Sequence, residues 1–76
     1  METTTFELRG EFIELCNLLK LAGIANSGGQ GKMMVGDGIV QVDGVIETRK
    51  TAKIRAGQMV ECLGHQIQVQ NSSPSA

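Results

Sequence analysis

The sequence predicts one small domain of the α+β class, in which two helices come before a series of short strands. Residues 11–22 are rich in leucine and repeat their apolar side chains at helical spacing. Residues 28–35 are rich in glycine and follow a pattern typical of a capped helix start. Turn signals at residues 43–44 and 64–65 each stand between two apolar runs and indicate β-hairpins. A chain of 76 residues has room for a single domain, and such a domain buries only roughly 60% of its unfolded surface.

A strand and the longest helix are expected in the first third of the chain. Residues 3–8 alternate loosely between polar and apolar side chains and are rich in threonine, which favours a strand. Residues 11–22 predict a helix whose apolar face consists of Phe12, Leu15, Cys16 and Leu19. Glu11 and Glu14 would occupy its first turn, where acidic side chains suit the helix dipole. Gly23 follows the last turn and is a suitable C-terminal cap.

The second predicted helix begins with a capping pattern. Ser27 and Gln30 have the spacing of a capping box, in which each side chain accepts a hydrogen bond from an amide at the helix start. Gly28 and Gly29 occupy the first turn, so their amides have neither an intrahelical partner nor a side chain that shields them. Each glycine weakens a short helix by about 1 kcal/mol relative to alanine, so packing must hold this helix. The side chains expected to pack against the first helix are Met33, Met34 and Val35. The alternative is a mobile loop.

The second half of the chain is predicted to form two hairpins and a tail. Residues 39–42 form a strand that returns through an Asp-Gly pair, which is typical of a type I′ turn. Residues 59–63 and 66–70 are expected to pair across a Gly-His turn. Residues 71–76 are polar and contain the only proline, so we expect a disordered tail after a domain of residues 1–70.

Charge is distributed unevenly, although the net charge is only −1. Residues 1–16 carry four acidic groups against one basic group, whereas residues 48–56 carry four basic groups and no acid. An uneven field of this kind can favour one face for a polyanion such as RNA. The four basic residues are Arg49, Lys50, Lys53 and Arg55. The alternative is a solvated loop that only aids solubility.

The start of the sequence and its apolar runs give an expectation about location. The first residues are acidic and rich in threonine, unlike a signal peptide. The apolar runs are too short to span a bilayer. We therefore expect a cytoplasmic protein that makes no membrane contact.

No combination of residues predicts an active site, a metal site or a bound cofactor. Cys16 and Cys62 are too few for a zinc site or a disulfide scaffold, and we expect both to be buried. His65 has no nucleophile or carboxylate placed beside it by spacing, and we expect it in a hairpin turn. The segment that ends in Gly31-Lys32 lacks the other residues of a Walker A loop. The sequence therefore predicts a protein that is not an enzyme; the rival hypothesis is an enzyme that uses Lys32 or His65.

Residues 11–69 resemble the S4-like RNA-binding domain, in motifs that occur in the same order and at the same spacing. The shared motifs are L-x-x-A-G-I at residues 19–24, Ser27 at the second helix start, G-x-V-x-V-D-G at 38–44, a basic stretch at 49–53 and A-G-Q-x-V at 56–60. The chain is most similar to small stand-alone bacterial members of this family. With them it shares S-G-x-Q-x-K at residues 27–32 and E-T-R-K at 47–50.

The resemblance implies two helices packed on a small, mostly antiparallel sheet, which is the S4-like fold with its αL motif. It also implies binding of structured RNA, with ribosomal and tRNA-like RNAs as candidates, through the second helix and the adjoining strand and loop. Gly28 stands where the family usually has an arginine that pairs with phosphate, so bare amides and Lys32 would substitute for it in part. The expected RNA-binding residues are Ser27, Gly28, Gly29, Gln30, Lys32, Arg49, Lys50, Lys53 and Arg55.

Two further expectations concern the partner. Phe6 and Phe12 are expected in the core, which leaves no aromatic ring to stack on bases. Recognition of a folded or double-stranded shape is therefore expected, rather than recognition of a single-stranded sequence. The rival hypothesis is a protein-interaction or accessory module that uses the same fold without RNA, and the acidic first helix favours it.

Overall fold

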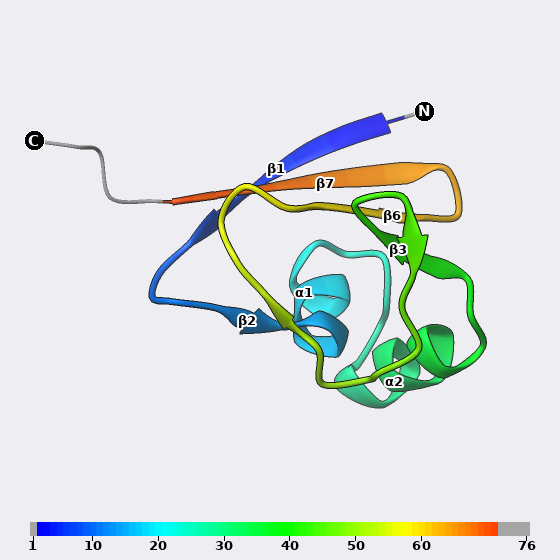
Figure 1. The fold of residues 1–76 in the computed structure, drawn as a ribbon. Helices are drawn as coiled ribbons and strands as arrows, with labels where there is room; N and C mark the ends of the chain where they lie inside the picture. The colour runs from blue at the N-terminus through cyan, green and yellow to red at the C-terminus, as the bar shows by residue number, and fades with distance from the viewer. Residues whose placement is uncertain (1, 72–76) are drawn as a thin grey trace, which may run out of the picture.

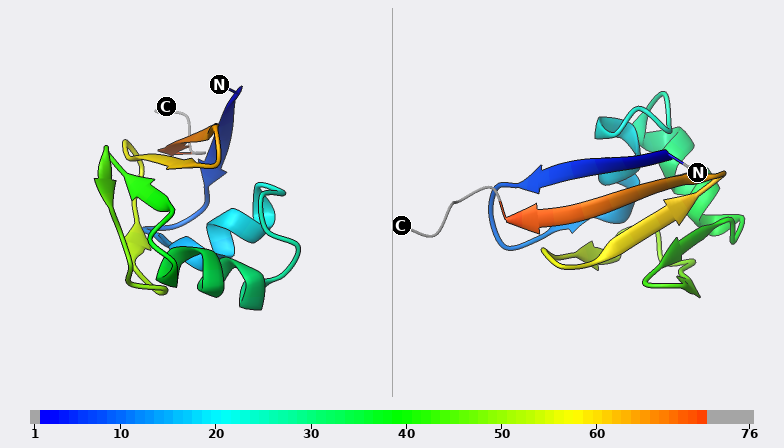
Figure 2. Two further views of the ribbon diagram at one scale, coloured as in Figure 1. Left: turned by 90° about the vertical axis from the view of Figure 1, so that its right-hand side faces the viewer. Right: turned by 90° about the horizontal axis from the view of Figure 1, so that it is seen from above.

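The protein consists of a sheet with two helices packed against it (Figure 1). The computed structural model describes residues 2–71. Its main sheet has five strands in the order β1-β7-β6-β3-β4, and a separate ribbon pairs β2 with β5. Figure 2 shows both helices on the same face of the main sheet. The predicted α+β class, with two helices on a mostly antiparallel sheet, is confirmed. The elements are β1 (Glu2–Leu8), β2 (Ile13–Glu14), α1 (Leu15–Leu21), α2 (Gly28–Gly36), β3 (Val40–Val42), β4 (Val45–Ile46), β5 (Lys53–Ile54), β6 (Met59–Cys62) and β7 (His65–Asn71).

The first and last strands lie side by side. β1 pairs in parallel with β7, whereas the other neighbouring strands of the main sheet are antiparallel. Parallel neighbours need a long crossover connection, and both helices lie within the connection between β1 and β7. The predicted first strand is confirmed. Of the predicted tail, 71–76, only Asn71 belongs to the described residues, and it is the last residue of β7.

Both hairpin turns use two consecutive residues with positive φ. Asp43 and Gly44 have φ values of 53° and 84°, as a type I′ turn requires, so the predicted turn between β3 and β4 is confirmed. The turn between β6 and β7 lies one residue earlier than predicted, at Leu63 and Gly64, whose φ values are 50° and 82°. His65 is therefore the first residue of β7, and its predicted place in the turn is wrong.

The predicted helix over residues 11–22 is wrong at its start, because α1 begins only at Leu15. Glu14 belongs to β2 and precedes the helix without capping it through its side chain. Glu11 and Glu14 therefore do not lie in a first helical turn. Phe12 is 39% exposed and lies outside the hydrophobic core, so its predicted place on the buried face is also wrong.

Backbone groups from a distant segment cap the start of α1. The amides of Leu15 and Cys16 donate to the carbonyls of Ala52 and Lys50, at 2.9 and 3.3 Å. These bonds satisfy donors that a helix start otherwise leaves free, and they fix the segment around residue 51 against the helix. Gly23, with φ of 81°, ends the helix as predicted.

The predicted second helix is confirmed, and a glycine sets its distance from the first. A Cβ on Gly31 would lie 2.6 Å from the carbonyl oxygen of Cys16, so only glycine fits where the two helices meet. Met34 and Val35 are buried as predicted, whereas Met33 is 68% exposed and its predicted packing is wrong. Three consecutive helical residues span about 200° around the axis and cannot all face the same neighbour.

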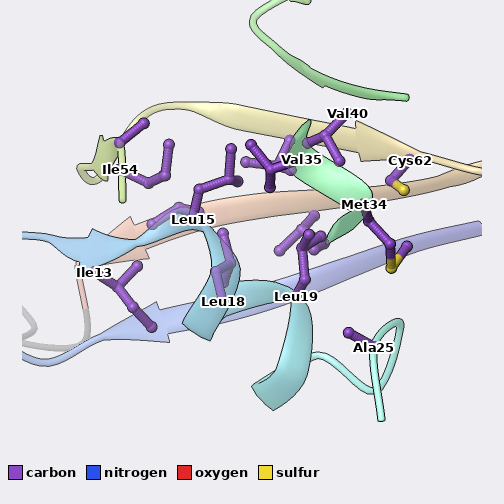
Figure 3. Packing of buried hydrophobic residues seen from close by; sticks show 14 of the residues in the cluster. Ile13, Leu15, Leu18, Leu19, Ala25, Met34, Val35, Val40, Ile54 and Cys62 are labelled. Atoms are coloured by element: carbon purple, nitrogen blue, oxygen red, sulfur yellow. The ribbon is translucent and has the colours of Figure 1, made fainter. Parts of the chain in front are cut away.

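Aliphatic side chains from both layers fill the space between the helices and the sheet (Figure 3). Cys16 and Cys62 are buried and unpaired, as predicted. In β7, Ile67 and Val69 face inward and alternate with glutamines, as the strand period requires. No helix within residues 2–71 is long and apolar enough to cross a membrane.

Candidate nucleic-acid interface

The start of α2 presents free backbone amides. The amide of Gln30 donates to Ser27 Oγ at 3.1 Å, and the amide of Gly31 donates to the Ser27 carbonyl at 3.0 Å. The Gln30 side chain accepts from the amide of Asn26, so this half of the predicted capping box reaches one residue further back. The amides of Gly28 and Gly29 have no acceptor within residues 2–71. With the helix dipole, these two amides favour an anion at the helix start.

One face of α2 runs from these amides to the other end of the helix. Gly28, Lys32 and Gly36 are four residues apart, and residues at that spacing share one helix face. The Lys50 side chain packs against Gly36 at the far end of this face. A Cβ added to Gly36 would lie 3.2 Å from Lys50 Cε and 3.9 Å from its Nζ. We call Gly28, Gly29, Lys32, Gly36 and Lys50 the α2 strip. It combines exposed cations with backbone that a ligand can approach closely at Gly28 and Gly29.

The basic loop, which we define as residues 49–55, lies beside the start of α1. Its backbone carries the carbonyls that cap that helix, so the loop is anchored although most of its side chains are exposed. Arg49, Thr51, Ala52 and Lys53 line a polar hollow of about 400 Å³. The amide of Arg55 donates to Gln58 Oε1 at 2.7 Å, and its side chain is exposed. The loop thus presents cations from a fixed backbone.

Arg49 is already paired with an acid. Its Nε lies 3.1 Å from Glu47 Oε2, its Nη2 donates to Oε1 at 3.2 Å, and its amide also donates to Oε2. These hydrogen bonds lower the pKa of Glu47 and raise that of Arg49. A phosphate that binds Arg49 must therefore compete with Glu47.

Lys53 lies over an aromatic ring. Its Nζ is 4.9 Å from the centroid of Phe12, within the range of a cation–π interaction. Glu14 stands opposite Lys53 in the ribbon of β2 and β5. Phe6 is partly buried and packs against the core, as expected, but Phe12 is a partly exposed ring beside the basic loop. The expectation that no aromatic ring is exposed is therefore wrong.

The predicted RNA-binding residues fall into two groups at the two ends of α2. The start of α2 carries Ser27, Gly28, Gly29 and Gln30, whereas the basic loop lies beside Gly36 at the other end (Figure 2, left). The eight steps from Gly28 to Gly36 advance about 12 Å along the helix axis. The fold brings Lys50 onto α2 but not next to the free amides, and Lys32 occupies the stretch between them.

The other candidates from the sequence do not form a catalytic group. His65 Nδ1 lies 3.4 Å from Glu2 Oε1, a carboxylate partner that sequence spacing did not indicate. Both side chains stand at the paired ends of β1 and β7 and are well exposed. Within the described part of the chain, no three His, Cys, Asp or Glu residues gather as a metal site would require.

Sequence reasoning missed three side chains that adjoin the predicted interface. Glu47 pairs with Arg49, and the separation of two residues was a visible signal for this pair. Phe12 and Arg9 line an apolar hollow of about 390 Å³ near the basic loop. The sequence offered one indication that Phe12 precedes the helix, because no Ser, Thr, Asp or Asn stands ahead of it as a capping residue.

Comparison with known proteins gives consistent matches over most of the chain. Residues 6–70 match the model of the S4 domain family. The chain is 52% identical over 66 residues to the Escherichia coli protein named "Putative RNA-binding protein YbcJ". The aligned residues make up 86% of this chain and 94% of that protein. The same figures apply to a Shigella flexneri protein named "Uncharacterized protein YbcJ". The solution structure of E. coli YbcJ, described as revealing an αL motif involved in RNA binding, matches with a TM-score of 0.66 and 47% identity, over 92% of this chain and 87% of that chain.

Proposed function

The chain belongs to the S4 domain family, and on that premise we propose that it is a non-catalytic protein that binds the phosphate backbone of structured RNA. The name of its relative YbcJ supports RNA as the partner. The residues proposed to contact RNA are Ser27, Gly28, Gly29, Gln30, Lys32, Arg49, Lys50, Lys53 and Arg55. The cytoplasmic location expected from the sequence stays a prediction.

The α2 strip is the observation that carries this proposal. Gly28 leaves the backbone open at the start of one helix face, Lys32 adds a cation in the middle, and Lys50 lies against Gly36 at the far end. An RNA strand laid along α2 would meet free amides first and then the two ammonium groups. Contacts of this kind position RNA without reading its sequence, because phosphates are the same at every nucleotide.

Four of the proposed cations are free to bind phosphate. Lys32, Lys50 and Arg55 have no ion-pair partner within residues 2–71, and Lys53 has only the ring of Phe12. Arg49 is the exception, because its side chain already forms a salt bridge with Glu47. Four phosphate contacts predict a slope of about −3 to −4 in a plot of log affinity against log salt concentration. Affinity should then fall on the order of 100-fold between 50 and 200 mM salt.

Neutralising one lysine at a time tests the contact surface. Lys50→Gln should weaken binding to a fluorescent RNA hairpin on the order of 10-fold at 50 mM salt, measured by anisotropy. Lys20→Gln is the matched control, because it removes the same charge from an exposed position in the last turn of α1. Equal losses in the two variants would mean that only net charge matters and that the proposed surface is wrong.

Gly28→Glu separates binding from folding at the start of α2. No atom lies within 4 Å of a Cβ built at this position, so the side chain fits. A carboxylate in a first helical turn stabilises the helix, by about 0.3–1 kcal/mol, and replacing glycine adds to this gain. The same carboxylate repels phosphate. We expect a higher unfolding temperature together with weaker RNA binding; unchanged RNA binding would exclude the amides from the interface.

A protein-interaction module is the second candidate, and the hairpin of β3 and β4 favours it. Val45 and Ile46 are 68% and 57% exposed on β4, at the edge of the main sheet. Exposed apolar side chains on an edge strand are suited to pairing with another chain. If the protein retains no cell RNA in a salt-sensitive manner, and Ile46→Ser removes a protein partner that the wild type holds, this candidate replaces the first.

A further inference from the structure

An apolar hollow lies at the end of β1, beside the basic loop. Its lining includes Phe6 and Leu8 from β1, Phe12 from the connection to β2 and Leu21 from the end of α1. Its volume is about 390 Å³, within the range of small-molecule pockets. Phe12 and Leu21 are 39% and 56% exposed, so neighbouring side chains within residues 2–71 leave much of their apolar surface uncovered.

The ribbon of β2 and β5 holds Phe12 against the basic loop. Ile13 stands opposite Ile54, and both are buried. Because side chains alternate along a strand, the residues on either side of these two share the outer face. That face therefore carries Phe12 and Glu14 from the β2 side and Lys53 and Arg55 from the β5 side. Lys53 Nζ lies over the Phe12 ring, 4.9 Å from its centroid. The ammonium lies over one face of the ring, and Phe12, which is 39% exposed, also lines the apolar hollow.

One cation and one acid line this hollow, and a second cation lies next to it. Arg9 lines it and has no hydrogen-bond or ion-pair partner within residues 2–71. Lys53 adjoins it through Phe12 and also lines the polar hollow of the basic loop. Glu7 is the acid in the lining, and Glu14 stands opposite Lys53. A ligand that suits both hollows has a flat apolar body attached to an anion, which describes a nucleotide.

We infer that the hollow beside Phe12 receives one unpaired nucleobase of the bound RNA, which stacks on the exposed part of the ring while its phosphate lies at Lys53. This inference rests on the RNA binding proposed above, and it adds a preference within that function. A duplex that is completely paired keeps its bases stacked on each other and offers none to the hollow, whereas a bulged nucleotide can turn outward. The protein should therefore prefer structured RNA that contains an unpaired nucleotide.

Two RNA hairpins test the inference, one fully paired and one identical except for a single bulged 2-aminopurine. The wild-type protein should bind the bulged hairpin more tightly and quench its fluorescence. Phe12→Leu keeps an apolar side chain but removes the ring, so it should weaken binding to the bulged hairpin about 5- to 150-fold and leave the paired hairpin unaffected. Arg9→Gln, at an exposed position outside the core, should weaken the bulged complex less strongly.

The outcomes separate this inference from the proposed function. If the wild type binds neither hairpin, RNA binding itself fails. If it binds both equally and Phe12→Leu changes nothing, RNA binding stands and the base-binding hollow is refuted. If Phe12→Leu weakens both hairpins equally, the ring only positions Lys53, which also refutes the inference. The fluorescence of the wild-type complex gives an answer that does not depend on the folding of any variant.

Discussion

Gly31→Ala should destabilise the protein although alanine is the better helix former. At this position a Cβ would lie 2.6 Å from the carbonyl oxygen of Cys16 and 3.2 Å from its carbonyl carbon. α1 would have to move by about 0.8 Å before these atoms reached the 3.4 Å of an ordinary contact. The clash is with backbone, which cannot turn aside as a side chain can, so the cost lies near the upper end of overpacking, about 3 kcal/mol. Alanine recovers about 1 kcal/mol of helix propensity, which leaves a net loss of about 2 kcal/mol.

Thermal unfolding followed by circular dichroism measures this loss. A loss of about 2 kcal/mol should lower the Tm by roughly 8–16 °C in a domain of this size. Gly29→Ala is the matched control, because it lies in the same helix and the nearest atom to its Cβ is Ser27 Oγ at 3.8 Å. The control should be as stable as the wild type or up to about 1 kcal/mol more stable. If Gly31→Ala unfolds at or above the wild-type temperature, the close approach of α1 and α2 described here is incorrect.

Four other predictions concern the helix cap, the loop and the core. Ser27→Ala removes the acceptor for the Gln30 amide and should cost about 1 kcal/mol in chemical unfolding; no loss would mean that this cap is dispensable. Glu47→Gln frees Arg49 and should tighten RNA binding about 2- to 5-fold at 50 mM salt. Because Arg49 lowers the pKa of Glu47, the ion pair should stabilise the fold above pH 4.5, the ordinary value, and lose its effect as the pH falls through the lowered value. The stabilities of wild type and Glu47→Gln should then converge in acid, and a constant difference would contradict this. The Cys16 and Cys62 thiols are buried, and burial raises the pKa of Cys62, so mass spectrometry should show labelling by a thiol reagent about 100-fold faster in the unfolded protein; rapid labelling of the native protein would contradict the described core.

Turns and helix starts that depend only on neighbouring residues could be predicted from the sequence. The Asp43-Gly44 turn was predictable because few residue pairs adopt two consecutive positive φ values. The start of α2 was predictable because Ser27 caps it through its own side chain. The turn of the second hairpin was predicted one residue too late, because Leu63 takes a positive φ that its residue type does not suggest.

Features that depend on distant contacts could not be predicted in this way. α1 starts late because the carbonyls of Lys50 and Ala52 cap it, and a capping group far along the chain leaves no local pattern. The exposure of Phe12 follows from that late start, since a helix over 11–22 would have buried the ring. The basic loop was recognisable from its charge, but only the three-dimensional arrangement places it at the far end of α2.

The salt dependence of RNA binding is the most direct test of a phosphate-binding surface on α2 and the basic loop. For the wild type, a plot of log affinity against log salt concentration should have a slope of about −3 to −4. In the double variant Lys50→Gln with Lys53→Gln, each lost phosphate contact should reduce the magnitude of the slope by about one, which gives about −1 to −2. A double variant with the wild-type slope, or a wild-type protein whose RNA binding does not depend on salt, would contradict a phosphate-binding surface on α2 and the basic loop.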